Sequence, residues 1–265
     1  MPEQEQTLTS WFADCPFALV AFSGGVDSSL VAYLARLHMG DARMMAVISA
    51  SPSLKLSDLD AGKQFCMEHD IPLKIIETEE LKNPNYAANP ANRCYFCKHT
   101  LYTELQVLAK RKAPCWILNG TNTDDLGDYR PGLQAASEFE VHSPLSACGL
   151  NKEAVRTMAR SLELVCWDKP ASPCMSSRIP YGQEVTLKKL RQIEAGEALV
   201  MKLGFPIVRL RHHGTKAVIE IPPEDIPRLK LQERTLTQQL SILGFAETEI
   251  DDEGFVSGKL NRVLP

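Results

Sequence analysis

The sequence predicts an α/β protein in which a parallel-sheet domain is followed by a smaller α+β C-terminal domain. Three observations support this class: short apolar runs alternate with segments of helical period, a glycine-rich turn follows the first apolar run, and the pattern changes after residue 168. Strands that alternate with helices in this way form βαβ units with parallel strands. The 265 residues suffice for two domains, which we expect at residues 1–168 and 169–265.

In the first predicted domain, the spacing of apolar residues separates strands from helices, because helical segments repeat their apolar residues every three to four positions. Ser57 is predicted to cap one helix, with Asp60 in the capping-box position, and Gly40 is predicted to end another. The predicted strands are residues 17–22, 44–49, 73–77 and 115–119, and the predicted helices are 28–38, 57–68, 98–111 and 151–162.

Two polar segments interrupt this alternation. Residues 120–143 and the Pro- and Ser-rich residues 169–182 are predicted to be long loops, which in a folded domain commonly carry function. The second loop marks the predicted domain boundary. Beyond it, we expect helices at residues 186–203 and within 224–243, and strands at 207–211, 217–221 and near 247–251.

Composition excludes several classes of protein. The net charge of −4 argues against non-specific coating of nucleic acid. The longest stretches without a charge, residues 15–26 and 235–246, are too short to span a bilayer. No basic N-terminal segment typical of a secretory signal precedes an apolar run, and eight cysteines are few for a disulfide scaffold. We therefore expect a cytoplasmic protein with reduced thiols and no membrane partner.

The most informative motif is SGGVDSS, residues 23–29, directly after the first predicted strand. Two glycines let the backbone approach a ligand closely, and the helix that follows offers unpaired N–H groups and a positive dipole end. Together these features predict an anion site, most naturally for phosphate. The segment has no lysine, so it differs from the loop of ordinary P-loop kinases and GTPases.

Three cysteines stand in polar surroundings. Cys94 and Cys97 form a CxxC, and Cys174 lies in the loop 169–182. A CxxC alone fits half of a zinc site, a redox pair or two structural thiols, and no second CxxC exists to complete a four-cysteine zinc site. Three thiolates also suit an iron–sulfur cluster with one open iron.

Five motifs occur together in one order, and the set resembles the ATP-dependent sacrificial sulfur transferases, the LarE family of the PP-loop ATP pyrophosphatase superfamily. Other PP-loop enzymes, such as NAD synthetase, share only the first motif. The resemblance implies an adenine nucleotide alpha-hydrolase-like PP-loop domain and a C-terminal domain that binds substrate and mediates homo-oligomerisation. The motifs are SGGVDSS, RCYFCK (residues 93–98), NGTNTDDLGDYRPG (119–132), SxCMSSRIPYG (172–182) and SGKLN (257–261).

The resemblance also implies a reaction. Such an enzyme uses ATP and Mg²⁺ to adenylylate a carboxylate of pyridinium-3,5-biscarboxylic acid mononucleotide, releases pyrophosphate, and makes a thiocarboxylate for the nickel-pincer nucleotide cofactor. Asp27 and Cys174 are the implied catalytic residues. The sulfur would come from Cys174 itself or from a 4Fe–4S cluster on Cys94, Cys97 and Cys174.

Further binding residues follow from the same resemblance. Arg209 and Arg211 alternate along a predicted strand and so share one face; with Ser177 and Arg178 they are expected to hold the substrate phosphate. Glu197 and Glu220 are additional metal-ligand candidates. The implied ATP-binding residues are Ser23, Gly24, Gly25, Asp27, Ser28, Ser29, Gly120, Asp124 and Asp125.

Two alternatives stay open at this point. The first is a tRNA or small-molecule thiolase with the same ATP-binding half, which the acidic net charge does not favour for a tRNA partner. The second is a non-catalytic iron–sulfur or nucleotide sensor. The intact SGGVDSS segment together with a thiol-bearing loop favours an enzyme over a sensor.

Overall fold

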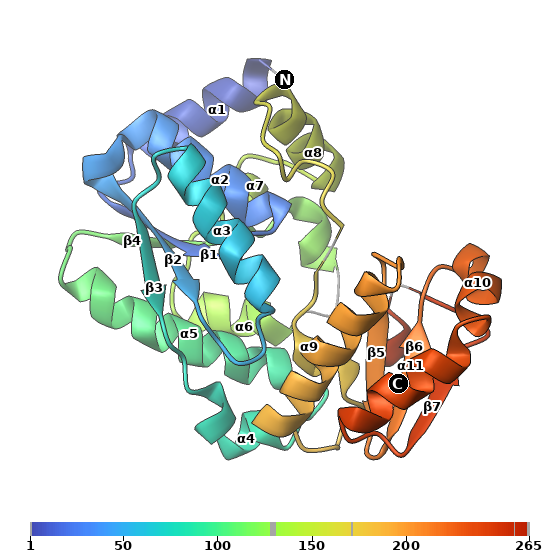
Figure 1. The fold of residues 1–265 in the computed structure, drawn as a ribbon. Helices are drawn as coiled ribbons and strands as arrows, with labels where there is room; N and C mark the ends of the chain where they lie inside the picture. The colour runs from blue at the N-terminus through green and yellow to red at the C-terminus, as the bar shows by residue number, and fades with distance from the viewer. Residues whose placement is uncertain (1, 128–130, 171, 257, 264–265) are drawn as a thin grey trace. The chain divides into compact units, whose positions relative to one another are not determined.

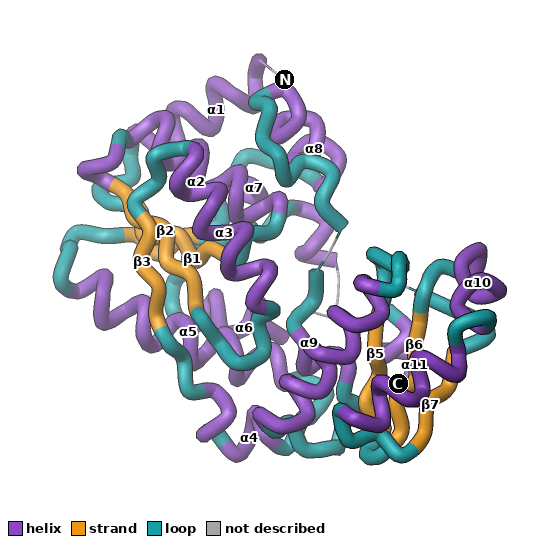
Figure 2. Tube along the Cα trace, in the orientation of Figure 1, coloured by secondary structure: helices purple, strands orange, loops and turns teal. Residues whose placement is uncertain are grey.

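In the computed structural model, four parallel strands form the sheet of the first part of the chain (Figures 1 and 2). Their order is β3-β2-β1-β4, so β1 lies inside the sheet and the connections leave it toward both sides. The predicted α/β class with a parallel sheet is confirmed. The strands are β1 (Ala18–Phe22), β2 (Met44–Ser49), β3 (Leu73–Ile76) and β4 (Trp116–Leu118).

The structure describes residues 2–127, 131–170, 172–256 and 258–263. It divides into two compact units, each made of two chain segments. The first unit comprises Met1–Glu80 and Asn92–Ser172, and the second comprises Leu81–Ala91 and Pro173–Pro265. The chain therefore enters the second unit a few residues after the predicted boundary, and a short segment that the sequence placed in the first domain belongs to the second unit.

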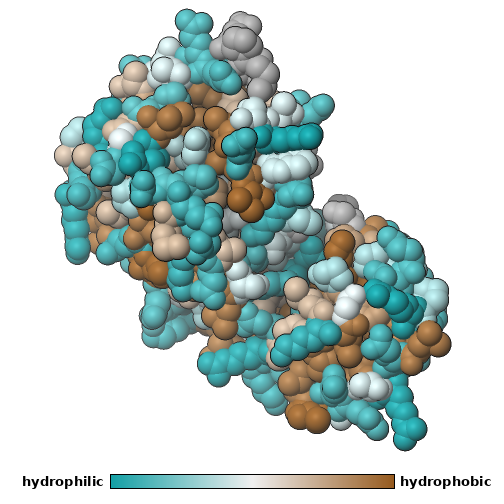
Figure 3. All heavy atoms as spheres, turned by 45° about the horizontal axis from the view of Figure 1, so that its top comes forward, coloured by the Kyte–Doolittle hydropathy of each residue, from teal (hydrophilic) through white to brown (hydrophobic). Residues whose placement is uncertain are grey.

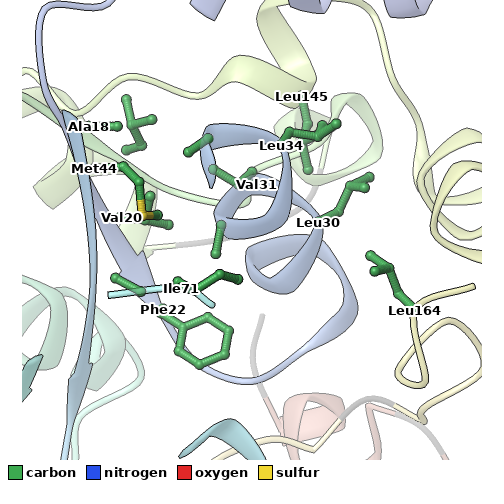
Figure 4. Close-up of a cluster of buried hydrophobic side chains, with 14 of the residues drawn as sticks. Ala18, Val20, Phe22, Leu30, Val31, Leu34, Met44, Ile71, Leu145 and Leu164 are labelled. Carbon is green, nitrogen blue, oxygen red and sulfur yellow. The ribbon is translucent and has the colours of Figure 1, made fainter. Parts of the chain in front are cut away.

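Both faces of the parallel sheet are covered, which explains why β1 is apolar throughout: all five of its residues are buried. Val20 and Phe22 pack in one core with α2 and α3 (Figure 4), whereas Leu19 and Ala21 pack in another with α5. The helices of this unit are α1 (Pro2–Ala13), α2 (Val26–Met39), α3 (Leu56–Glu68), α5 (Arg93–Lys110), α6 (Pro131–Glu138), α7 (Pro144–Ala147) and α8 (Lys152–Ser161).

Several helices differ from the prediction. Helix α3 begins at Leu56 after Lys55, with no side-chain cap, so the capping role predicted for Ser57 is wrong. Helices α1 and α6 were not predicted: α1 is mostly polar, α6 is short and begins with Pro and Gly, and each buries only a few residues. Leu8 and Phe12 of α1 are buried, four residues apart, and α6 lies within the segment that the sequence indicated as loop.

The second unit is built on a three-stranded sheet of order β5-β6-β7, in which β5 and β6 are antiparallel and β6 and β7 are parallel. Thr186 caps α9 by accepting a hydrogen bond from the Lys189 N–H at 3.2 Å. The single helix predicted within residues 224–243 is two helices. The elements are α4 (Pro84–Ala87), α9 (Leu187–Lys202), β5 (Arg209–His213), β6 (Lys216–Glu220), α10 (Ile226–Lys230), α11 (Glu233–Ile242) and β7 (Glu247–Ile250).

Residues around α4 join the second unit through hydrogen bonds with residues about 90 positions later. The Val185 N–H donates to the Ala87 carbonyl at 2.8 Å, and Tyr86 and Ser176 share a hydrogen bond of 2.6 Å between their hydroxyls. The Asn89 amide donates to the carbonyls of Ile179 and Pro180. Such pairings join distant parts of the chain, and no local sequence pattern indicates them.

Within the described residues, no helix combines the length and the apolar character that crossing a bilayer requires. On the face drawn in Figure 3, hydrophobic side chains occur in scattered groups among hydrophilic ones. Single exposed apolar residues of this kind are ordinary for folded proteins.

Candidate active site

The SGGVDSS segment connects β1 to α2, as the sequence predicts, and its backbone is shaped by hydrogen bonds within the segment. Gly24 has a φ of 70°, a left-handed conformation that favours glycine. The Ser23 N–H donates to the Ser28 hydroxyl at 3.1 Å, and that hydroxyl donates to the Gly25 carbonyl at 3.1 Å. Gly25 is the N-cap of α2 and has no capping side chain. The loop thus presents backbone at the positive end of α2, which suits a phosphate.

Gly120 brings the end of β4 directly against the start of α2. A Cβ atom at this position would lie 2.7 Å from the Ser28 nitrogen and 2.8 Å from the Asp27 carbonyl carbon. Any side chain at residue 120 would therefore push the phosphate loop and β4 apart. This packing is a physical reason for glycine here, and the contact of Gly120 with ATP stays a prediction.

Two carboxylates lie close together here, Asp27 within the SGGVDSS segment and Asp125 beside it. Asp27 accepts a hydrogen bond from the Asn122 side-chain amide at 3.0 Å, and the Asn122 N–H donates to Asp125 at 3.3 Å. Burial raises the pKa of Asp27 above its ordinary value, the Asn122 hydrogen bond lowers it, and the charge of Asp125 raises it further. A cation that neutralised this pair would relieve their repulsion.

The donor set fits Mg²⁺. In the chain as far as it is described, no group of three or more His, Cys, Asp or Glu side chains is arranged to hold a metal ion by itself. Magnesium in a nucleotide site needs only one or two carboxylates, since phosphate oxygens and water supply the other ligands. Asp27 and Asp125 would hold such an ion beside the loop, where it would neutralise charge on the phosphates.

The fold brings two lysines close to the SGGVDSS segment and to the carboxylates near it. The sequence did not indicate either of these contacts. The Lys169 ammonium donates to the Gly24 carbonyl at 3.1 Å and lies 3.0 Å from a carboxylate oxygen of Asp58. The Lys152 backbone N–H donates to Asp124 at 3.0 Å, and its ammonium lies 3.6 Å from Asp125. Asp124 therefore binds the first residue of α8, in addition to any contact with ATP.

A buried carboxylate that the sequence also missed, Glu80, ties together the segments that follow β2 and β3. It accepts hydrogen bonds from the hydroxyls of Thr78, at 2.7 Å, and Ser53, at 3.3 Å, and from Ser51. Parallel strands end at one edge of a sheet, so this cluster lies on the same edge as the loop after β1. It fixes the shape of that edge.

The cysteines predicted to hold a cluster are divided between the two units. Cys94 is exposed and Cys97 half-buried in the first turns of α5, three residues apart and thus on one side of the helix. Cys174 is half-buried and belongs to the second unit. Because no metal-binding group is formed among the described residues, the structure does not support the 4Fe–4S cluster, and we derive no chemistry from one.

In the second unit, Arg178 organises the turn that carries Cys174 and Ser177. Its guanidinium is buried and donates to both carboxylate oxygens of Glu197, at 2.8 and 3.2 Å. The remaining nitrogen donates to the carbonyls of Pro173, at 2.6 Å, and Cys174, at 3.2 Å, and to the Ser177 hydroxyl. Arg178 thus fixes the turn, and a contact with the substrate phosphate stays a prediction.

Arg211 continues the same network from β5. It donates to Glu220 at 2.7 Å and to the Ser177 carbonyl at 2.8 Å. Glu197 and Glu220, proposed from the sequence as further metal-ligand candidates, are each buried against a guanidinium. In this arrangement they balance arginine charge, and a metal-binding role for them stays a prediction.

Arg209 is the third guanidinium of this group, beside two carboxylates. Burial lowers the pKa of Arg209 to about 10, and the neighbouring charge of Arg178 lowers it further, against the opposing effect of Glu197. Its guanidinium carbon lies 5.0 Å from the centre of the Phe255 ring. Guanidinium groups bind phosphate oxygens through paired hydrogen bonds, so phosphate is an anion that suits this group chemically.

Some residues of the motifs and loops noted in the sequence lie outside the described residues: 128–130 of the third motif, Ser257 of the last motif, and Ala171 of the loop 169–182. Residues 258–261 of the last motif are described, and Lys259 is the charged residue among them. Its ammonium lies 2.7 Å from Asp251 and 3.8 Å from Glu220. The motif is thus connected to the arginine group through Glu220.

His212 is a buried residue of β5. Its ring lies against Phe245, and its Nε2 forms a hydrogen bond of 3.1 Å with Gln192. Burial lowers the pKa of His212 to about 4, and the charge of Lys189 lowers it further. Within the described residues its Nδ1 has no hydrogen-bond partner.

We expect the full chain to lose stability as the pH falls from 6.5 to 4. The unfolded chain takes up a proton at the ordinary histidine pKa, whereas folded His212 takes it up only near pH 4. The free energy of unfolding should therefore fall by about 3 kcal/mol through this residue. Urea unfolding across this range measures the effect, and His212→Gln should flatten the profile. An equal slope in the variant would contradict the assignment.

Comparisons with known proteins show similarity along almost the whole chain. The family model of NAD synthase matches residues 4–91, which include the SGGVDSS loop. A protein of Synechocystis sp. without an assigned function is 42% identical over 98% of this chain and 97% of its own length. One of Methanocaldococcus jannaschii, also without an assigned function, is 26% identical over 89% of each chain.

A relative with a named activity is the pyridinium-3,5-bisthiocarboxylic acid mononucleotide synthase of Lactiplantibacillus plantarum. It is 33% identical to this chain over 98% of this chain and 95% of its own length. The aligned region therefore includes the phosphate loop of the first unit and the arginine group of the second.

Proposed function

Because this chain belongs to the LarE family, that of the pyridinium-3,5-bisthiocarboxylic acid mononucleotide synthase, we propose that it is an ATP-dependent sulfur transferase acting on pyridinium-3,5-biscarboxylic acid mononucleotide. It activates a carboxylate of this substrate and replaces one oxygen with sulfur. The product is a thiocarboxylate for the nickel-pincer nucleotide cofactor. Its cytoplasmic location and homo-oligomeric state are part of this proposal.

The observation that carries the ATP half of the proposal is the loop between β1 and α2. Its glycines and the N-terminus of α2 provide backbone donors for phosphates, and the adjacent Asp27 and Asp125 provide ligands for Mg²⁺. A magnesium ion held by these carboxylates would withdraw charge from the phosphates. The substrate carboxylate then attacks the α-phosphorus, and pyrophosphate leaves with the electron pair.

The arginine group supports a phosphate-bearing acceptor. Arg209 and Arg211 share one face of β5, and Ser177 is fixed next to them by Arg211. Guanidinium groups favour the phosphate of a mononucleotide over a neutral acceptor. Arg178 and Glu197 act as positioning residues because they hold the turn that follows Cys174.

The acyl-adenylate must next meet a sulfur nucleophile, and we propose that Cys174 bears it. In the sacrificial route, Cys174 Sγ attacks the carbonyl carbon and AMP leaves. Removal of the Cα proton then breaks the Cβ–S bond, which leaves the thiocarboxylate and dehydroalanine at position 174. Cys174 is common to this route and to the cluster route implied by the family, so it is the residue to test first.

Product analysis with α-labelled ATP tests the proposed function. With Mg²⁺ and the pyridinium mononucleotide acid, the labelled product should be AMP, accompanied by pyrophosphate and a thiocarboxylate product detected by mass spectrometry. Omission of the acceptor should suppress pyrophosphate release. If labelled ADP is the only product, the PP-loop reaction is excluded for this chain.

A further inference from the structure

Lys169 is a cation at the phosphate loop that the loop sequence itself does not contain. The SGGVDSS segment has no lysine, unlike loops of the Walker type, whose lysine reaches the phosphates. In the fold, Lys169 arrives from the segment after α8, about 145 positions later in the chain. Lys169 and the SGGVDSS segment both belong to the first unit.

The Lys169 ammonium lies against the backbone that would bind phosphate. It donates to the Gly24 carbonyl at 3.1 Å. The Gly24 oxygen and the Gly25 nitrogen belong to one peptide group, so the ammonium lies less than ~6 Å from the Gly25 nitrogen. The peptide is trans, so its C=O and N–H point in opposite directions, and a phosphate on the Gly25 N–H lies on the other side of this peptide group. The ammonium therefore reaches such a phosphate only by leaving the carbonyl, a move that the flexible four-carbon stem of lysine allows.

Asp58 keeps this ammonium in place from α3. One carboxylate oxygen lies 3.0 Å from the Lys169 ammonium, and the other accepts a hydrogen bond from the Ser172 hydroxyl at 2.7 Å. Burial raises the pKa of Asp58, but the hydrogen bonds from Ser172 and Lys169 outweigh it, so the pKa lies below its ordinary value. Asp58 therefore stays ionised at neutral pH and fixes the position of the lysine.

We propose that Lys169 is a phosphate-binding residue of the ATP site and supplies the positive charge that the loop lacks. The proposal rests on the proposed use of ATP and extends it to a residue on another segment. Lys169 exchanges its hydrogen bond to the Gly24 carbonyl for one to a phosphate oxygen, while Asp58 holds the other side of the ammonium. A charge-assisted bond to phosphate is stronger than one to a neutral carbonyl, so the exchange favours the bound nucleotide.

Nucleotide binding to the full-length protein tests this role. Calorimetric titration with Mg²⁺ and a non-hydrolysable ATP analogue should show an affinity at least about tenfold lower for Lys169→Ala than for the native chain. Binding of AMP should change less than threefold if Lys169 contacts the β- or γ-phosphate. Lys169→Arg should recover part of the ATP affinity, because the charge remains.

A matched control comes from α3, where Lys63 and Asp60 form a surface ion pair at 2.9 Å. Lys63→Ala removes a lysine–aspartate pair of the same kind and should leave both affinities unchanged. Lys169→Gln retains a donor for the Gly24 carbonyl, so it should fold even if the alanine variant does not, and it should still lose ATP affinity.

The outcomes separate this inference from the proposed function. No loss of ATP affinity in Lys169→Gln overturns the phosphate role of Lys169. An equal loss of ATP and AMP affinity would assign the contact to the α-phosphate and not to the β- or γ-phosphate. If the native chain binds the ATP analogue in the expected way but produces no thiocarboxylate, the proposed sulfur transfer fails and the role of Lys169 stands.

Discussion

Replacement of Cys174 by alanine should reduce thiocarboxylate formation to the background of the assay while acceptor-dependent release of pyrophosphate continues for one turnover. The physical reason is that the two reactions use different residues. Adenylylation depends on the β1–α2 loop of the first unit, whereas the thiol that attacks the adenylate lies in a turn of the second unit. Loss of the thiol leaves the acyl-adenylate without its nucleophile. Labelled-ATP analysis and mass spectrometry of the product measure the two halves separately.

Cys115→Ala is the control for the cysteine experiment. Burial raises the pKa of the Cys115 thiol to about 11, so this thiol is protonated at neutral pH and is a poor nucleophile. The variant should keep full activity. If Cys174→Ala also keeps full activity, Cys174 does not bear the transferred sulfur.

The mass of the native protein after a single turnover distinguishes the two sulfur routes. Sacrifice of Cys174 predicts a chain lighter by one hydrogen sulfide, with dehydroalanine at that position. A catalytic route through Cys94, Cys97 and Cys174 predicts an unchanged mass, iron in anaerobically purified protein, and loss of iron in each of the three alanine variants. The first result excludes the cluster route for this chain, and the second excludes sacrifice.

Asp27→Asn should lower the rate of pyrophosphate release by about 100-fold or more. The substitution is isosteric but removes a negative charge that would bind Mg²⁺ beside the phosphates. Because burial and Asp125 raise the pKa of Asp27, its ionised form destabilises the fold at neutral pH. The variant should therefore be at least as stable as the native chain.

A combined measurement of activity and melting temperature checks this expectation. Loss of activity with an unchanged or higher melting temperature assigns Asp27 to the reaction, whereas a parallel loss of both would make it a structural residue. Asp60→Asn, which changes an exposed aspartate of α3, should affect neither quantity. Raising the Mg²⁺ concentration should restore part of the Asp27→Asn rate.

Local patterns in the sequence predicted most of the first unit. The four strands were predicted within two residues of their observed ends. For β1 the reason is that a parallel strand covered on both faces is a continuous apolar run. The glycine-rich loop after β1 was predicted because it is a contiguous motif between a strand and a helix. Helix α6 was missed because its stability comes from the buried Ala135 and Ala136 and not from a strong apolar pattern.

Contiguous segments of the sequence by themselves determined the class of fold, the phosphate loop and the family, because each of these is recognised from neighbouring residues. Only the tertiary structure decided which distant groups meet. It placed Lys169 on the loop, paired Arg178 with Glu197 and Arg211 with Glu220, and joined residues 81–91 to the second unit. Such pairings depend on the packing of elements far apart in the chain, where a charge finds its partner by burial and distance, and neither quantity is encoded in local spacing.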